Sequence, residues 1–191
     1  MIQHIITCPV LIEELKKVLR DMAVKPTVHP MDYSVHINAD IMEAELRRCT
    51  QEIQGARAGI GILVGQQCKA CRPISEIAAG CHGEMPREEN CIQMILGVEK
   101  NTTLLKDRTA IMTPGWITMM HQSIKDGNWR VEDARMNMGW YDQILMLDTG
   151  TMPLTDEVLL EFFELTQTPI DILKVDLDYF KQVITNMLEG T

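Results

Sequence analysis

The chain has 191 residues, of which 46% are hydrophobic and 24% charged, and its formal net charge is −9. This composition is ordinary for a globular protein, and the length suits one domain, so we expect residues 1–191 to form a single domain. The acidic balance argues against nucleic acid as a partner, since little would displace the counterions of its backbone. No apolar window approaches the ~18 residues of a membrane span, and the first residues lack the basic start of a signal peptide. We therefore expect a cytoplasmic protein and leave a homo-oligomer open.

Short apolar runs alternate with amphipathic segments, which is typical of strands and helices around a parallel sheet. The sequence predicts an α/β fold with one mostly parallel, open sheet and flanking helices, in Rossmann- or flavodoxin-like layering. Asn90 and Thr155 are expected to cap helices, and the segment 65–90 has a loop-like pattern. Strands are expected at residues 4–7, 27–30, 59–64, 109–113, 143–147 and 170–175, with helical stripes between them such as Leu11, Leu15, Val18, Leu19, Met22 and Met42, Leu46, Cys49, Ile53.

The cysteines are the most informative residues of the chain. A non-exported protein of this size does not need disulfides, so its thiols serve the core, catalysis or metal binding. Ligands of open α/β sheets bind beyond the carboxyl ends of the strands, and Cys8 follows the first predicted strand while Cys68 and Cys71 follow the third. Cys91 begins a predicted helix nearby in sequence. The sequence therefore predicts a site at this edge with Cys8, Cys68, Cys71 and Cys91 as ligands of zinc or an iron–sulfur cluster.

Two of these cysteines lie at predicted helix starts, where the helix dipole lowers the pKa of a thiol. We therefore expect Cys8 and Cys91 to favour the thiolate form. Cys49 lies on an apolar helical stripe and is expected in the core. The pair Cys81-His82 is a further ligand candidate, in a loop whose position the sequence does not fix.

Other residues at strand ends suggest a pocket beside the thiols. The predicted cofactor-binding residues are Gly65, Trp116, Asp148 and Gly150. His29 and His36 flank the end of the second strand, and a structural role is the default expectation for both. The motifs of nucleotide binding and of serine hydrolysis do not occur in the chain.

Four stretches of the sequence resemble the DUF1638 family of uncharacterised proteins. They are ITCPVLIEEL at residues 6–15, the segment 65–73, NCIQMILG at 90–97 and TPGW at 113–116. The resemblance implies a site of three cysteines, Cys8, Cys71 (or Cys68) and Cys91. This chain has an additional cysteine in the central loop, and Arg72 stands where the family commonly has histidine, so the choice between Cys68 and Cys71 stays open.

The resemblance also implies a biochemical setting. Members are common in methanogens and other anaerobes, often in the company of corrinoid-dependent methyl transfer. It implies a zinc or iron–sulfur site accessory to that chemistry, with a corrinoid as a further cofactor and a corrinoid protein or methyltransferase as partner. Two alternatives stay open: a non-catalytic module that holds a corrinoid, another small molecule or a partner against Trp116, and a thiol–disulfide redox protein that uses Cys68 and Cys71. Whether the protein is an enzyme is also open.

Overall fold

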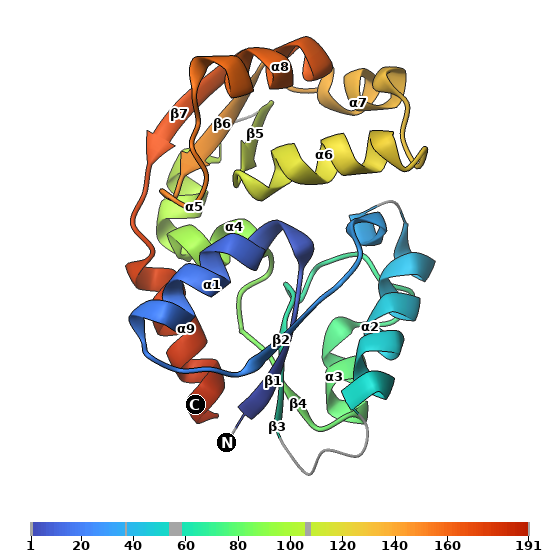
Figure 1. Cartoon of the computed structure of the whole chain (residues 1–191), viewed down its shortest axis with the longest axis vertical. Helices are drawn as coiled ribbons and strands as arrows, with labels where there is room; N and C mark the ends of the chain where they lie inside the picture. The colour runs from blue at the N-terminus through green and yellow to red at the C-terminus, as the bar shows by residue number, and fades with distance from the viewer. Residues whose placement is uncertain (1, 37, 54–58, 106–107, 191) are drawn as a thin grey trace.

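The computed structural model describes residues 2–36, 38–53, 59–105 and 108–190. Their strands pair in parallel and form two open sheets, one in the lower and one in the upper part of Figure 1. The first sheet has the order β2-β1-β3-β4, from β1 (Ile2–Thr7), β2 (Thr27–Pro30), β3 (Gly59–Leu63) and β4 (Gly83–Glu84). The second has the order β5-β6-β7, from β5 (Thr109–Met112), β6 (Gln143–Asp148) and β7 (Ile170–Lys174).

The predicted α/β class, the parallel pairing and the flanking helices are confirmed. The expectation of one continuous sheet is wrong, because the strands of the described residues are divided between two sheets of four and three. Periodicity identifies a strand but does not indicate which strand it pairs with, so the sequence pattern does not reveal that the strands form two sheets. The single-domain assignment stays a prediction.

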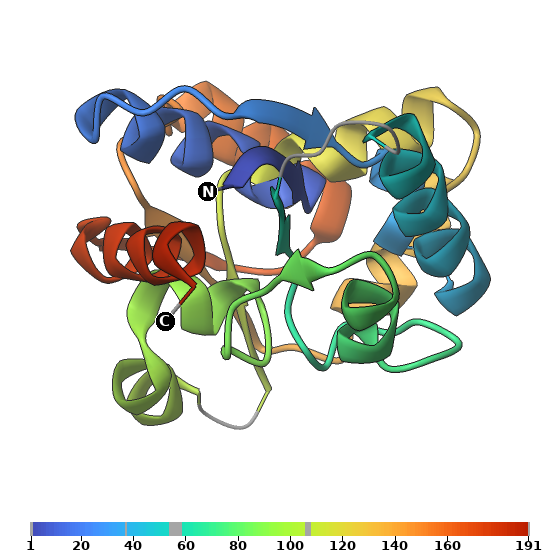
Figure 2. The same cartoon turned by 90° about the horizontal axis from the view of Figure 1, so that it is seen from below.

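Helices cover both faces of the first sheet. Figure 2 shows α1 (Ile12–Asp21) and α9 (Asp178–Glu189) on one side of it, and α2 (Ala39–Ile53) and α3 (Ile74–Gly80) on the other. The stripes predicted for the first two helices are the buried ones, because an amphipathic helix turns its apolar side to the sheet. Cys49 of α2 is fully buried, as its place on that stripe predicted.

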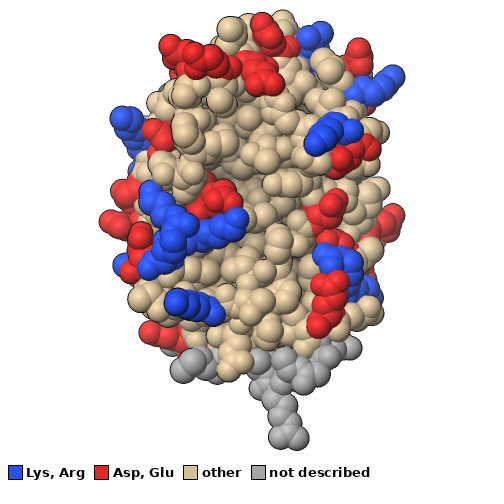
Figure 3. Space-filling view, viewed as in Figure 1, with Lys and Arg blue, Asp and Glu red and all other residues tan. Residues whose placement is uncertain are grey.

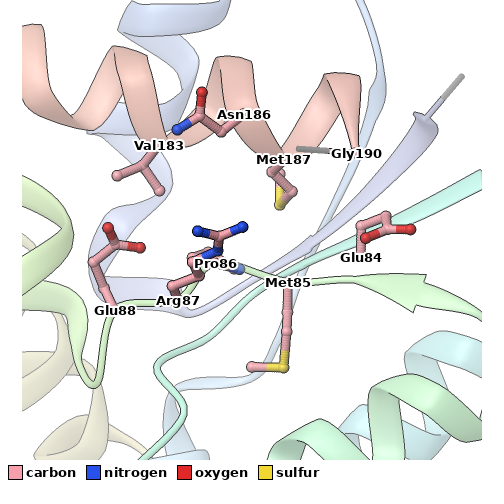
Figure 4. A pocket seen from close by; sticks show the side chains of 9 residues that line it. All are labelled: Glu84, Met85, Pro86, Arg87, Glu88, Val183, Asn186, Met187 and Gly190. Carbon is pink, nitrogen blue, oxygen red and sulfur yellow. The ribbon is translucent and has the colours of Figure 1, made fainter.

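The C-terminal helix α9 returns from the second sheet to the first. A Cβ on Gly61 of β3 would lie 2.9 Å from the terminal methyl of Met187, so the helix packs closely on the strand. The hydroxyl of Tyr179 donates to Glu88 at 2.9 Å, which ties the start of α9 to the segment after β4. A small pocket remains between this segment and the helix, with Arg87 on one wall and Val183 and Met187 on the other (Figure 4).

The remaining helices join the sheets or cover the second one. Asn90 caps α4 as predicted, since its side chain accepts hydrogen bonds from the backbone N–H groups of Ile92 and Gln93. Thr155 caps α8 in the same way. Elements α3, β4, α5 and α7 were not predicted, because each is at most eight residues long and too short for a clear apolar period. The bounds are α4 (Cys91–Leu96), α5 (Val98–Leu104), α6 (Gly115–Lys125), α7 (Val131–Met138) and α8 (Asp156–Thr166), with short 3-10 helices η1 (Pro9–Leu11) and η2 (Tyr33–His36).

The carboxyl ends of the two sheets meet. After β1 the chain forms η1, and the carbonyl oxygen of Val10 accepts a hydrogen bond from the hydroxyl of Thr113, which follows β5, at 3.0 Å. A Cβ on Gly115 would lie only 2.3 Å from the same oxygen, so this glycine lets α6 start against η1. The residues that follow β1 are thereby held beside the residues that follow β5.

A second contact joins the sheets along α1. The buried carboxylate of Glu14 accepts hydrogen bonds from the hydroxyls of Thr149 and Thr151, at 2.8 and 3.1 Å. Lys17 donates to the carbonyl oxygen of Thr149 at 3.0 Å. On the face shown in Figure 3, charged side chains lie mostly toward the margins and the middle is largely uncharged. No helix in the described part of the chain is long and apolar enough to cross a membrane.

The contact between Val10 and Gly115 predicts a large effect of one methyl group. Gly115→Ala places a Cβ against the carbonyl oxygen of Val10, which cannot move without a shift of the main chain. Such overpacking lowers the free energy of unfolding by about 2 kcal/mol. For a chain of this size that corresponds to a melting temperature lower by roughly 4–8 °C, measurable by circular dichroism. Gly80→Ala is the control, because a Cβ there meets nothing within 4 Å. Equal melting temperatures for the two variants would contradict the close approach.

Candidate thiolate site

Cys8 lies where the first sheet meets the second. Its backbone N–H donates to the carbonyl of Leu63 at the end of β3, which continues the pairing of β1 with β3 by one residue. Its side chain is 2% exposed. The sulfur lies 3.4 Å from Nε2 of His36, the last residue of η2. Cys8 is therefore a buried thiol in contact with an imidazole.

Backbone hydrogen bonds bring Cys68 and Cys91 to the same place. In the loop after β3, the N–H groups of Gln66 and Gln67 donate to the carbonyls of Glu88 and Glu89, at 3.1 and 2.9 Å. A Cβ on Gly65 would lie 2.4 Å from the carbonyl oxygen of Glu89, so only glycine allows the two segments to lie so close. The loop that carries Cys68 is thereby fixed to the segment that leads into Cys91.

The three sulfurs influence one another's ionisation. Burial raises the pKa of the Cys8 thiol well above its usual value, and charges on Cys91 and Cys68 would raise it further. Burial also raises the pKa of Cys91 to about 12, with Cys68 adding to the effect, and it raises the pKa of Cys68. Such effects place the three side chains in the same part of the molecule. The expected lowering of the Cys8 and Cys91 pKa by helix dipoles is wrong, because desolvation outweighs the short helices that follow these residues.

Trp116 reaches the thiols from the second sheet. It lies in the first turn of α6, and its indole forms a hydrogen bond with the Cys91 side chain that favours the thiolate. Its ring also lies against His36, with centroids 4.8 Å apart and planes tilted by 47°. Burial lowers the pKa of His36 to about 4, so the imidazole is neutral at physiological pH. Trp116 thus covers the site that the first sheet provides.

Cys71 points away from this cluster. Its exposed thiol donates to a carboxylate oxygen of Asp40 on α2, at 2.8 Å, and this hydrogen bond raises the pKa of Cys71. The next residue, Arg72, pairs with Glu43 of the same helix at 2.9 Å. The Cys-x-x-Cys sequence therefore splits, with Cys68 turned inward and Cys71 docked on the outside of α2.

The other candidate residues have contacts of their own. Cys81 donates to the carbonyl of Ala78 at the end of α3, and His82 is exposed. Asp148 accepts a hydrogen bond from the N–H of Gly150, whose φ of +64° favours glycine, in the loop that contacts α1. Gly65 serves the close packing described above. Cofactor binding by Gly65, Trp116, Asp148 and Gly150 stays a prediction.

His36, for which a structural role was the default expectation, contacts the Cys8 sulfur in the structure. Its companion His29 pairs with His4 at 3.0 Å instead. The signal was its position shortly after the second strand, on the same rim as the thiols. In the described ranges, no three histidine, cysteine, aspartate or glutamate side chains are close enough to hold one metal ion as they stand.

The comparisons with known proteins agree with the resemblance seen in the sequence. Residues 30–184 match the family described as "Protein of unknown function (DUF1638)". The match includes Cys68, Cys91 and Trp116, and it begins after Cys8. Neither a curated protein nor a solved structure matches the chain. Because the match spans most of the 191 residues, the protein belongs to the DUF1638 family.

Proposed function

We propose that the protein binds a metal ion or an iron–sulfur cluster through the thiolates of Cys8, Cys68 and Cys91. The observation that carries the proposal is that hydrogen bonds bring three cysteine-bearing segments to the junction of the sheets, where Cys8 is buried, Cys68 and Cys91 are half-buried, and charges on Cys68 and Cys91 would raise the pKa of Cys8. Zinc and iron–sulfur clusters are the groups that proteins hold with several thiolates.

The surroundings of the sulfurs suit metal-bound thiolates. Backbone hydrogen bonds from Val10 to Cys8, from Gly65 to Cys68 and from Ile92 to Cys91 all favour the charged form. Such bonds to ligand sulfurs tune thiolate sites in metalloproteins. Burial opposes ionisation of the thiols until a cation arrives, and a bound cation deprotonates a thiol outright. The donor chemistry therefore fits a soft or borderline metal, which would supply a Lewis acid if it is zinc or an electron relay if it is a cluster.

Among the residues that the structure describes, no three donor side chains are close enough to hold one metal ion. Metal sites commonly form only as the ligands gather, because binding is coupled to local folding. Because the loop that carries Cys68 is hydrogen-bonded to the segment that leads into Cys91, we expect the two segments to move together toward Cys8 when metal binds. A role in corrinoid-dependent methyl transfer remains a prediction from the family resemblance.

Metal content tests the proposal directly. Protein purified without oxygen is expected to carry zinc, or iron with sulfide, in stoichiometric amount by elemental analysis. Cys8→Ser, Cys68→Ser and Cys91→Ser should each lose most of it, because removal of one thiolate leaves an incomplete ligand set. A UV–visible spectrum separates a cluster, which absorbs in the visible range, from zinc, which does not.

Two matched controls are available in the chain. Cys71→Ser changes an exposed thiol on α2 and Cys81→Ser a thiol bonded within α3, so both should keep the full metal content. A loss with Cys71→Ser as large as with Cys68→Ser would refute the assignment of the inward cysteine. A wild-type protein that takes up no metal while its thiols stay reduced would refute the proposal as a whole.

The raised pKa values predict a steep pH dependence of metal affinity. Each thiol is protonated in the metal-free protein at neutral pH, so binding must release its proton. Affinity therefore rises with pH, by about tenfold per unit for each proton released and up to ~1,000-fold for three. Zinc competition against a chelator, corrected for the protonation of the chelator itself, measures the slope. A flat profile across neutrality would mean that the buried thiols are not the ligands.

A further inference from the structure

The imidazole of His36 enters the thiol cluster from outside the cysteine pattern. It is carried by η2, the turn after β2, and its Nε2 lies 3.4 Å from the Cys8 sulfur. The residue is half-buried and its ring lies against Trp116. Its nitrogen thus faces a buried thiol.

The distance between the two atoms is informative. In a tetrahedral zinc site, with Zn–S about 2.3 Å and Zn–N about 2.0–2.1 Å, the sulfur and nitrogen ligands of one ion stand about 3.6 Å apart. The pair Cys8 and His36 therefore already has the spacing of two ligands on a single ion. In a [4Fe–4S] cluster each iron takes one protein ligand, so ligands of neighbouring irons stand further apart; each iron of a [2Fe–2S] cluster takes two, so the spacing argues against the larger cluster and for two ligands on one metal ion.

We propose that Nε2 of His36 is the fourth ligand of the thiolate site, which makes it a single-ion site of three cysteines and one histidine for zinc or a similar divalent cation. The inference rests on the proposed function and narrows it. Cys8 and His36 form the fixed edge of the site, since β1 and η2 hold them at this spacing without metal. No three donors in the described ranges are placed to hold an ion together, so in this proposal Cys68 and Cys91 complete the site by moving toward that edge.

Trp116 has an outer role in this arrangement. Its indole bonds to the Cys91 side chain and its ring covers the imidazole, so it orients two of the four ligands from the second sheet. Outer partners of this kind typically change metal affinity by about 10–100-fold. A direct ligand is expected to matter more, and this difference separates the two roles.

The rival explanation is an ordinary hydrogen bond between the Cys8 thiol and a neutral imidazole. The variant His36→Asn distinguishes the two, because an amide can still bond to the thiol but is a poor ligand for zinc. His36→Cys restores a fourth ligand with a different donor atom. His121→Ala is the control, since this histidine faces Glu161 on the surface of α8.

Cobalt(II) is the probe, because it substitutes for zinc and its absorption reports ligand type and geometry. Wild-type protein should show sulfur-to-cobalt charge transfer and intense tetrahedral d–d bands, both removed by zinc. His36→Asn should lower the affinity by more than ~100-fold, beyond the range of an outer partner, and weaken the d–d bands. His36→Cys should keep tetrahedral bands with stronger charge transfer, Trp116→Phe should keep the band shape at modestly lower affinity, and His121→Ala should match wild type.

The possible results distinguish a failure of the His36 assignment from a failure of the proposed thiolate site. If wild type and His36→Asn bind cobalt with equal affinity and equal spectra, His36 is not a ligand, while the thiolate site stands. Iron and sulfide in cluster stoichiometry in anaerobically purified protein would also overturn the single-ion site and leave the thiolates in place. If wild type shows no sulfur-to-cobalt charge transfer, the thiolate site itself is wrong. Circular dichroism of each metal-free variant checks that it is folded. If His36→Asn does not fold, the cobalt spectrum of His36→Cys decides whether position 36 supplies a ligand.

Discussion

The carbonyl of Val10 is the point on which the arrangement of this molecule depends. This oxygen accepts a hydrogen bond from the hydroxyl of Thr113. The backbone at Gly115 also lies against it, because glycine has no side chain to keep the two apart. The contact fixes the end of β1 against the start of α6, and so brings Cys8 and Trp116 to the same junction, where His36 contacts both. Two parallel sheets that face each other with their carboxyl ends enclose the region where α/β proteins place ligands. This backbone approach, together with the contact of Glu14 with Thr149, brings the carboxyl ends of both sheets together.

Much of this organisation could be predicted from the sequence because local patterns carry it. The longer strands and helices repeat apolar residues at the period of their own geometry. Asn90 and Thr155 indicate helix starts, because their side chains can cap the first backbone N–H groups. The rim on which Cys8 lies follows from the general behaviour of parallel sheets. The division into two sheets could not be predicted, since it depends on which strands pair. The two-residue strand β4 is too short to have a pattern at all.

The site shows the same limit at the scale of single residues. Cys68 and Cys71 are equivalent by spacing, and only the turn between them decides that one faces the thiols and the other Asp40. The ionisation of Cys8 and Cys91 was misjudged because a helix start is visible in sequence, whereas the depth of burial is not. His36 lies near the rim by sequence, yet its contact with Cys8 depends on how η2 turns after β2.

The return of α9 has a consequence for how the protein is made. Helix α9 packs on β3 through Met187 and holds the segment before Cys91 through the bond from Tyr179 to Glu88. The first sheet is thus built from early parts of the chain but is covered by a late one. During translation, the wall that supports Cys91 cannot close until residues 178–189 have emerged from the ribosome. The segment that leads into Cys91 is therefore supported only once α9 has packed on the first sheet.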